Sequence, residues 1–355
     1  MEAKDVTIEM IMRQATAYKA SDVHITVGIP PKIRVDGKIM SLGMFPMLLP
    51  VDTERIAYSM MNEKQKAVFD EKGENDFSYS IATLGRYRVN AFRQRGSAAM
   101  VLRLVGSQIP TPESLGVPQS VIDLYDKKRG LILVTGPTGS GKSTTLASIV
   151  GKINNELEHN IITLEDPIEY MHRHARSIVN QREVGLDTES YAMALRSALR
   201  EDPDVILVGE MRDLETISTA ITAAETGHLV FSTLHTIGAA ATIDRIIDVF
   251  PPHQQEQIRT QLANVLESVI SQQLLPKADG RGRVAAFEVM HSTPAIKNLI
   301  RENKTHQIAS TIQMARASGM MLMDDALKEL YKAGAITRSD ALLFAQDRSM
   351  LEKVI

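Results

Sequence analysis

Residues 131–145 read LILVTGPTGSGKSTT, and this stretch decides the fold. Its first five residues form a short apolar run of the kind that a buried parallel strand uses. Gly136, four further residues and then Gly141-Lys142-Ser143 complete the G-x-x-x-x-G-K-[ST] pattern of a phosphate-binding loop, and a helix-like segment follows. Because strand, loop and helix come in the order that this pattern requires, the stretch predicts a nucleotide-binding α/β domain rather than a plain glycine-rich turn.

The residues of this loop have expected roles toward a polyphosphate. The glycines let backbone N–H groups turn inward, and the N-terminus of the following helix adds a partial positive charge. Lys142 is expected to reach the β- and γ-phosphates, and the Ser143 hydroxyl is expected to hold Mg²⁺. We therefore expect ATP and Mg²⁺ as ligands, with the phosphates held by Gly136, Pro137, Thr138, Gly139, Ser140, Gly141, Lys142, Ser143 and Thr144.

The composition excludes several classes of protein. The chain has no cysteine, which rules out disulfides, a Cys-ligated zinc ion and a thiol nucleophile. Its net charge of −3 provides no basic field for nucleic acid or anionic lipid. No apolar run approaches the roughly 18–20 residues of a membrane span, and no secretory segment is apparent. We expect a cytoplasmic protein whose contact with a membrane is peripheral.

The organisation of the rest of the chain predicts two domains. Residues 1–106 begin with an amphipathic helix and continue with strand-like runs, which is typical of a small α+β domain. Residues 107–119 hold three prolines and no sustained period, so we expect a semi-rigid linker.

Residues 120–355 alternate strand and helix patterns, as a parallel α/β sheet does. A long amphipathic helix is expected at 253–274, and the segment from about 293 to 355 reads as helical throughout. The strands are expected at 131–135, 160–164, 205–209, 229–233 and 283–290.

Polar side chains follow three of these strands. In an open α/β sheet, ligands bind at the carboxyl ends of the strands. Glu165 and Glu210 are candidates to polarise the attacking water or to hold Mg²⁺ through water, Glu210 together with Ser143, and the residue types do not rank the two. The alternative for both carboxylates is capping of a helix N-terminus. His235 could hydrogen-bond the γ-phosphate, and His228 is either a second nucleotide contact or structural.

Arginines gather in residues 86–95, RYRVNAFRQR, of the first domain. On a strand, Arg86 and Arg88 face one way while Tyr87 and Val89 face the other, and Arg93 follows near the end. The simplest interpretation is a solvated charged face. Because a phosphate site lies elsewhere in the chain, the alternative is that Arg86, Arg88 and Arg93 act on a nucleotide bound by a neighbouring subunit or domain.

Four motifs in a fixed order resemble those of the type II/IV secretion and pilus ATPases. They are the Walker A motif GPTGSGKST at 136–144, the Asp box ITLEDPIEY at 162–170, the Walker B motif DVILVGEMRD at 204–213 and the His box TGHLVFSTLHT at 226–236. The sequence is most similar to the PilT-type pilus retraction ATPases. AIKNLIRE at 295–302 resembles the AIRNLIRE element of that group, with Lys297 where arginine is usual.

The resemblance implies a PAS-like N-terminal domain and a RecA-like ATPase domain with a helical C-terminal segment. It also implies a homohexameric ring, with ATP bound between domains and arginines of the 86–95 strand reaching the phosphates. The implied partners are an inner-membrane platform protein at the pilus base and other pilus ATPases. Extension and secretion relatives usually carry an added N-terminal region and a four-cysteine zinc module, and neither is found here, which favours retraction.

Three functions follow from these observations. The first is a Mg²⁺-dependent ATPase motor that powers retraction of a type IV pilus by rotation of its domains, with twitching motility as the result. The second is an accessory ring subunit that binds nucleotide and acts as a structural adaptor for another motor. The third, a nucleic-acid motor, is disfavoured because the charge is near neutral and no basic–aromatic stripe is found.

Overall fold

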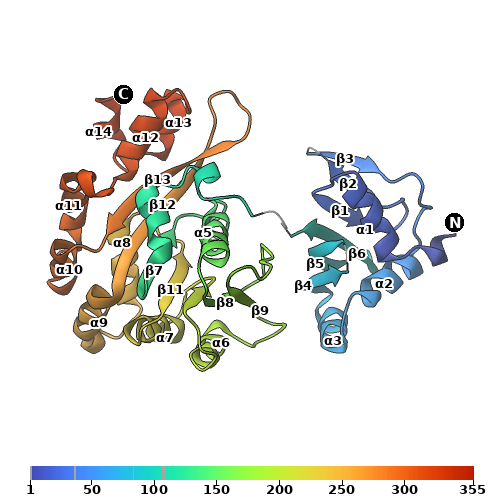
Figure 1. Cartoon of the computed structure of the whole chain (residues 1–355). Helices are drawn as coiled ribbons and strands as arrows, with labels where there is room; N and C mark the ends of the chain where they lie inside the picture. Colours follow the sequence, from blue (N-terminus) through green and yellow to red (C-terminus); the bar gives the residue numbers. More distant parts are fainter. Residues whose placement is uncertain (1, 36, 83, 106–108) are drawn as a thin grey trace. The chain divides into compact units, whose positions relative to one another are not determined.

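The computed structural model describes residues 2–35, 37–82, 84–105 and 109–355 (Figure 1). The chain divides into two compact units, Met1–Ser107 and Gln108–Ile355. The first residues of the predicted linker, Ser107 and Gln108, lie outside the described residues, as does the preceding Gly106. The domain limits drawn from the sequence therefore remain a prediction.

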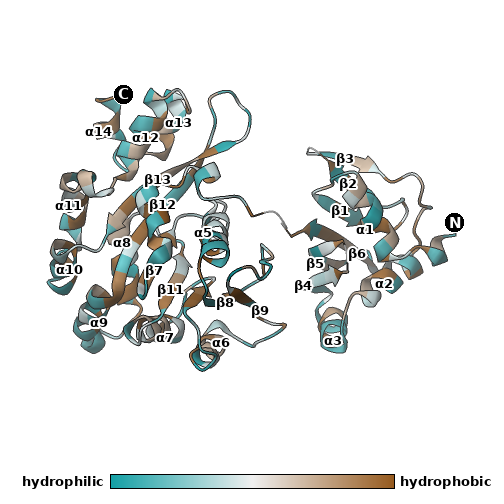
Figure 2. Cartoon of the chain, viewed as in Figure 1, coloured by the Kyte–Doolittle hydropathy of each residue, from teal (hydrophilic) through white to brown (hydrophobic). Residues whose placement is uncertain are grey.

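The first unit is built on a six-stranded antiparallel sheet of order β3-β2-β1-β6-β5-β4. Its core contains Phe69, Tyr87 and Leu102, which are almost fully buried. Helix α3 is hydrophilic on most of its surface (Figure 2) and buries only Phe69 completely. The elements are η1 (Ala3–Asp5), α1 (Ile8–Ala17), β1 (Asp22–Ile25), β2 (Lys32–Val35), β3 (Lys38–Ser41), α2 (Pro50–Ser59), α3 (Glu63–Lys72), β4 (Glu74–Ile81), β5 (Gly85–Gln94) and β6 (Ser97–Leu104).

The second unit is built on a seven-stranded sheet of order β13-β12-β7-β11-β10-β8-β9. All neighbours are parallel except β13, which runs antiparallel to β12 at one edge. The strands are β7 (Gly130–Thr135), β8 (Asn160–Glu165), β9 (Ile178–Glu183), β10 (Val205–Val208), β11 (Leu229–Leu234), β12 (Leu266–Pro276) and β13 (Arg283–His291).

Helices cover both faces of this sheet. On one face Ile132 and Val134 of β7 pack with Ile149 and Ile153 of α5, and on the other face Leu131 and its neighbours pack against helices α6 to α11. The helices are η2 (Glu113–Leu115), α4 (Gln119–Ile122), η3 (Asp123–Asp126), α5 (Lys142–Glu156), α6 (Tyr191–Ala198), α7 (Leu214–Glu225), α8 (Ala239–Asp248), α9 (Pro252–Val265), α10 (Pro294–Arg301), η4 (Thr305–Gln307) and α11 (Ile308–Met314).

The C-terminal segment is helical, as the sequence predicts, and its last part has a small core of its own. Met323, Leu327 and Leu342 pack there with Leu275 of β12 and Ala286 of β13. These strands extend beyond the rest of the sheet as a hairpin, whose tip is hydrophilic (Figure 2). The segment contains η5 (Arg316–Ser318), α12 (Met323–Lys332), α13 (Arg338–Phe344) and α14 (Arg348–Glu352).

The mixed α/β class predicted from the sequence is confirmed, but the long helix predicted at 253–274 is wrong. Helix α9 ends at Val265, and the chain continues directly as strand β12. Strand β12 lies between β7 and β13 and is buried on both faces, so its apolar residues do not alternate. Leu266, Val269 and Ile270 fit a helical period equally well, and periodicity alone does not separate the two structures.

None of the helices in the described part of the chain has the length and apolarity needed to span a bilayer.

Candidate nucleotide site

The phosphate-binding loop, residues 136–141, connects the buried strand β7 to helix α5. Gly136 and Gly141 have φ angles of 138° and 90°, which side chains rarely adopt. A Cβ on Gly136 would lie 2.2 Å from the carbonyl oxygen of Gln272, and one on Gly141 would lie 2.9 Å from the Gln272 amide nitrogen. Glycine is therefore required at Gly136 by close packing against the β12 backbone as well as by conformation, whereas at Gly141 the positive φ angle is the stronger constraint.

Gln272 is a site residue that the sequence analysis missed. Its side-chain Oε1 accepts a hydrogen bond of 2.8 Å from Thr145 Oγ1 of α5. The backbone carbonyl of Gln272 lies against Gly136, and its side chain bonds Thr145. This one buried glutamine therefore contacts the loop at its start and the helix just after its end. In the sequence, the polar pair Gln272-Gln273 lies inside an apolar run. The spacing of that run predicts a helix, which hides the role of the pair.

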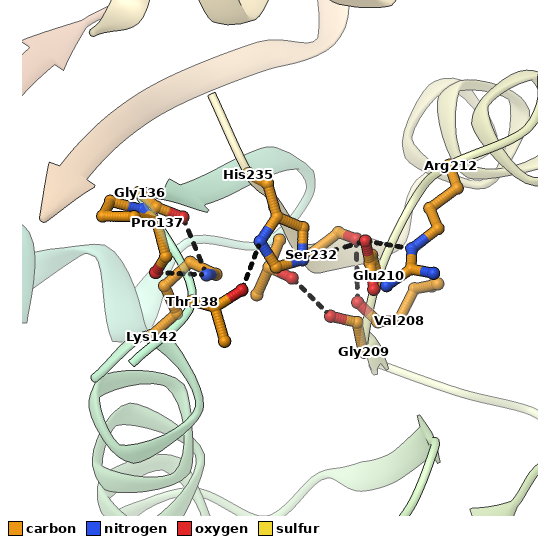
Figure 3. Close-up of polar contacts among 11 residues, drawn as sticks. Gly136, Pro137, Thr138, Lys142, Val208, Gly209, Glu210, Arg212, Ser232 and His235 are labelled. Atoms are coloured by element: carbon orange, nitrogen blue, oxygen red, sulfur yellow. Dashed lines mark hydrogen bonds and ion pairs between the residues drawn. The ribbon is translucent and has the colours of Figure 1, made fainter. Parts of the chain in front are cut away.

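Lys142 is buried, and its ammonium group is held by the loop itself. Its Nζ donates to the carbonyl oxygens of Gly136 (2.8 Å) and Pro137 (3.1 Å) (Figure 3). Burial lowers the pKa of Lys142, and the carboxylates of Glu210 and Glu169 oppose that shift. Charged phosphate oxygens accept hydrogen bonds more strongly than carbonyl oxygens do. The ammonium group can therefore leave these two carbonyls and donate to a phosphate instead.

The remaining loop residues present different surfaces. Pro137, Thr138 and Gly139 are exposed, and so is Ser143 in the first turn of α5. The Ser140 hydroxyl is buried and has no hydrogen-bond partner in this structure. Thr144 Oγ1 shares a hydrogen bond of 3.0 Å with the Tyr170 hydroxyl, which ties the helix to the Asp-box segment.

Glu210 and His235 meet at the carboxyl ends of β10 and β11, as expected. His235 Nε2 lies 3.0 Å from Glu210 Oε1, and His235 Nδ1 lies 3.5 Å from Thr138 Oγ1 of the loop (Figure 3). Arg212 Nε also donates to Glu210 Oε1. Glu210 does not cap helix α7, because Asp213 does so by accepting from Thr216 N at 2.8 Å.

The backbone between these strand ends is fixed by hydroxyl groups. Ser232 Oγ donates to the Val208 carbonyl at 2.8 Å (Figure 3). Thr233 Oγ1 donates to the Gly209 carbonyl at 2.6 Å. The residue before Glu210 is therefore bonded to the neighbouring strand. This fixed backbone limits where the Glu210 carboxylate can lie.

Glu165 ends strand β8, which is adjacent to β10. Gly209 N donates to the Leu164 carbonyl at 2.7 Å, so Glu165 and Glu210 follow directly on paired strands. Glu165 Oε1 accepts from Thr163 Oγ1 (2.6 Å) and from Gln181 Nε2 (3.0 Å). Burial raises the pKa of Glu165, although these two hydrogen bonds oppose the shift.

The structure does not bring His228 to the phosphate loop, which corrects its inclusion among the nucleotide contacts. His228 precedes β11, and the residue after it is paired with Gly130 at the start of β7. Six strand residues separate it from the end where the loop begins, a distance of roughly 20 Å at the usual rise. Its Nδ1 instead contacts the Ala223 carbonyl at 2.9 Å, at the C-terminal end of α7.

The arginines of β5 lie in the first unit and do not form one cluster. The strand is paired regularly, so alternation places Arg93 on the opposite face from Arg86 and Arg88. Arg93 lies over the Phe69 ring, 5.1 Å from its centroid, and 3.5 Å from Glu54 and Asp70.

Arg88, on the other face of the same strand, is half-exposed and lies 3.3 Å from Asp76. Exposed ion pairs of this kind contribute little to stability and exchange readily. An arginine in such a pair can therefore be released to a stronger anion.

A cavity of 630 Å³ adjoins the loop on the side of Gly141 and Thr144. Its walls also include Leu115 of η2 and Gln272, and the hairpin between β12 and β13 contributes Lys277 and Arg283. The volume is in the range of small-molecule sites. The cavity begins beside the phosphate loop, at Gly141 and Thr144.

The residues present fit a Mg²⁺ ion that is bound mainly by phosphates and water. Among the described residues no group of three or more His, Asp or Glu side chains could hold a metal alone. Mg²⁺ commonly keeps several waters and takes one or two protein ligands in nucleotide sites. The exposed Ser143 hydroxyl and the Glu210 carboxylate supply ligands of the required chemistry.

The comparisons with known proteins identify the family of the chain. The family described as "Type II/IV secretion system protein" matches residues 3–342. The chain belongs to this family. Within it, the chain is 52% identical to the type IV pilus retraction ATPase PilT of Pseudomonas aeruginosa over 322 residues, which cover 91% of this chain and 93% of PilT. It is 42% identical to the type IV pilus ATPase PilU of the same organism, over 98% of this chain and 91% of PilU.

A solved structure also matches along nearly the whole length. The crystal structure of the pilus retraction motor PilT with bound ADP is 53% identical and superposes with a TM-score of 0.91. The match covers 98% of this chain and 99% of that one. The recognition of a PilT-type ATPase from the sequence is therefore confirmed.

Replacing Gly136 with alanine tests the packing of the loop. We expect Gly136→Ala to weaken binding of a fluorescent ADP analogue by at least about tenfold, because the new methyl group displaces either the loop or β12 and the φ angle becomes strained. Gly185→Ala is the control, since Gly185 also has a positive φ but an open environment. Equal affinity in the two variants would contradict the packing argument.

Proposed function

We propose that this chain is an ATP-hydrolysing motor that powers the retraction of a type IV pilus. The observation that carries the proposal is the presence of Lys142, Glu210 and His235 at the strand ends together with 52% identity to PilT over nine-tenths of the chain. PilT is a retraction ATPase, and a solved structure of PilT contains bound ADP. The chain has the enzyme class of this family, ATPase, and its work is the removal of pilin subunits from a filament.

The chemistry follows from the residues at the carboxyl ends of the strands. Lys142 and the loop N–H groups hold the phosphates and orient them for in-line attack. Mg²⁺, when bound, neutralises charge on the β- and γ-phosphate oxygens. His235 lies between Thr138 of the loop and Glu210, so it orients the Glu210 carboxylate, and we assign to it a hydrogen bond with the γ-phosphate.

We assign different roles to the two carboxylates. Glu210 contacts His235, whose other ring nitrogen lies 3.5 Å from Thr138 of the phosphate loop, so Glu210 faces the phosphates and shares the metal with Ser143. Glu165 is held by Thr163 and Gln181 on the adjacent strand end, and burial raises its pKa toward that of an effective base. Glu165 therefore accepts a proton from the attacking water.

A second part of the site comes from a neighbouring subunit. We propose a homohexameric ring in which Arg88, with Arg86 beside it on the same face, reaches the phosphates bound by the next copy. The exposed pair of Arg88 with Asp76 is weak enough to be replaced by phosphate. Rotation of the two domains, joined by the linker at 107–119, then converts hydrolysis into motion.

The location and the partners follow from the same function. We propose that the ring acts in the cytoplasm on an inner-membrane platform protein at the pilus base, beside other pilus ATPases. The accessory-subunit alternative is kept because PilU, a pilus ATPase, is also a close relative. An assay of ATP hydrolysis by the isolated protein separates the motor from the accessory subunit, because a structural adaptor does not need to hydrolyse ATP.

Glutamine substitutions separate the two carboxylates. We expect Glu165→Gln to lower kcat by about two decades with an unchanged Mg²⁺ requirement, because it removes a general base. We expect Glu210→Gln to lower kcat and also to raise the Mg²⁺ concentration needed for half-maximal rate. Steady-state ATPase assays across a Mg²⁺ titration measure both effects, and Glu189→Gln, an exposed position, is the control. The opposite pattern would exchange the roles.

Mixed assemblies test the contribution of the neighbouring subunit. We expect Arg88→Ala copies, added to Lys142→Ala copies, to restore part of the ATPase activity that each variant lacks alone. The reason is that a wild-type loop then meets a wild-type arginine at some interfaces. ATPase rates of the separate and mixed variants measure this complementation. Full activity of Arg88→Ala alone would mean that Arg88 is only part of a solvated charged face.

Imaging of pili tests the direction of the motor. In a strain that lacks this gene, we expect surface pili to accumulate and twitching motility to stop, and the wild-type gene to reverse both. Lys142→Ala should fail to reverse either, because it removes the loop ammonium group to which we assign phosphate binding. A strain without pili would indicate extension instead of retraction.

A further inference from the structure

Glu288 is a buried carboxylate that lies outside the nucleotide site and has no part in the proposed chemistry. It is on β13, 3% exposed, and opposite Ser271 of β12 in the strand register. Burial raises the pKa of this carboxyl, and its hydrogen bonds oppose the rise. A buried carboxylate is costly unless hydrogen-bond donors surround its oxygens. The donors to Glu288 therefore show which parts of the fold it holds together.

One oxygen of Glu288 holds the start of helix α8. Oε1 accepts from Ala239 N at 2.7 Å, and Ser271 Oγ accepts from Gly238 N at 3.0 Å. Helix α8 has no capping side chain of its own, because Gly238 occupies its N-cap position. The two residues on β12 and β13 therefore replace the local cap.

The other oxygen of Glu288 holds the C-terminal helical segment. Oε2 accepts from Met323 N, at the start of α12, at 3.4 Å, and from the Gln346 side chain, between α13 and α14, at 3.1 Å. Helix α12 also lacks a side-chain cap, since Leu322 precedes it. A single carboxylate thus caps two helices and contacts the loop after a third.

Helix α8 begins close to the nucleotide site. Only residues 236–238 separate Ala239 from His235, which contacts both Thr138 and Glu210. This short connection is fixed at both ends, because Thr236 Oγ1 bonds Thr242 Oγ1 at 2.7 Å and Gly238 N bonds Ser271. The N–H group of Ala239, which donates to Glu288, is therefore joined to His235 by a short and well-bonded connection.

We propose that Glu288 is a positioning residue that couples the nucleotide site to the C-terminal helical segment α12–α14. Movement of His235 with the nucleotide state shifts the α8 N-terminus, and Glu288 transmits the shift to Met323 and Gln346. The reverse also holds, because coupling between two sites is reciprocal. The inference rests on the nucleotide binding within the proposed function, and it does not depend on the direction of the motor.

Hydrogen exchange with and without ADP tests this coupling. In the wild-type protein we expect ADP to increase the protection of amides in residues 323–352. In Glu288→Gln we expect that increase to be lost, because a glutamine has one acceptor oxygen and can hold only one of the two helices. We also expect the affinity for a fluorescent ADP analogue to fall by about fivefold or more, the low end of the usual range for coupled sites, because coupling between two binding events is reciprocal.

Two further variants keep the test decisive. Glu329→Gln, an exposed glutamate on α12, should behave as wild type. Gln346→Ala, an exposed position that folds even if Glu288→Gln does not, should lose the ADP-dependent protection in residues 338–352.

The contrary outcomes are equally distinct. ADP-dependent protection that is absent from the wild type, or that persists unchanged in these substitutions of Glu288 and Gln346, would overturn the coupling. Failure of the wild type to bind ADP would instead count against the proposed function.

Discussion

The close packing of strand β12 against the phosphate loop is the constraint on which the nucleotide unit depends. The carbonyl of Gln272 occupies the space that a side chain on Gly136 would need, and its amide contacts Thr145 in the following helix. The loop is therefore shaped by a partner strand that lies some 130 residues later in the sequence, beyond what its own glycines impose. The buried ammonium of Lys142 depends on the same arrangement, because the two carbonyls that hold it belong to the loop.

The polar residues at the strand ends are brought together by parallel pairing. Strands β8, β10, β11 and β7 end at one edge of the sheet, so residues from distant parts of the chain become neighbours. Pairing also determines which residues are separated. His228 and His235 are at the two ends of one strand, and Arg93 is on the opposite face of its strand from Arg88. The length of β11 separates the two histidines, and the two-residue period of β5 separates the two arginines.

Much of this fold could be predicted from the sequence because its signals are local. The strand–loop–helix order at the phosphate loop, and the carboxylates that follow apolar runs, need only neighbouring residues to be read. The strand at 266–276 could not be predicted, since a strand buried on both faces and a buried helix share the same apolar pattern. Gln272 was missed for that reason, and Glu288 was missed because its three partners come from separate helices and loops.

The contact of His235 with both Thr138 and Glu210 also selects one arrangement of protons when the imidazole is neutral. A carboxylate only accepts, so the proton of a neutral imidazole lies on Nε2 and is directed at Glu210. Nδ1 then carries a lone pair, and the Thr138 hydroxyl must donate to it. The three groups form an ordered donor chain that runs from the loop to the strand end. The oxygen of Thr138 consequently offers only acceptor capacity to any other group in the site.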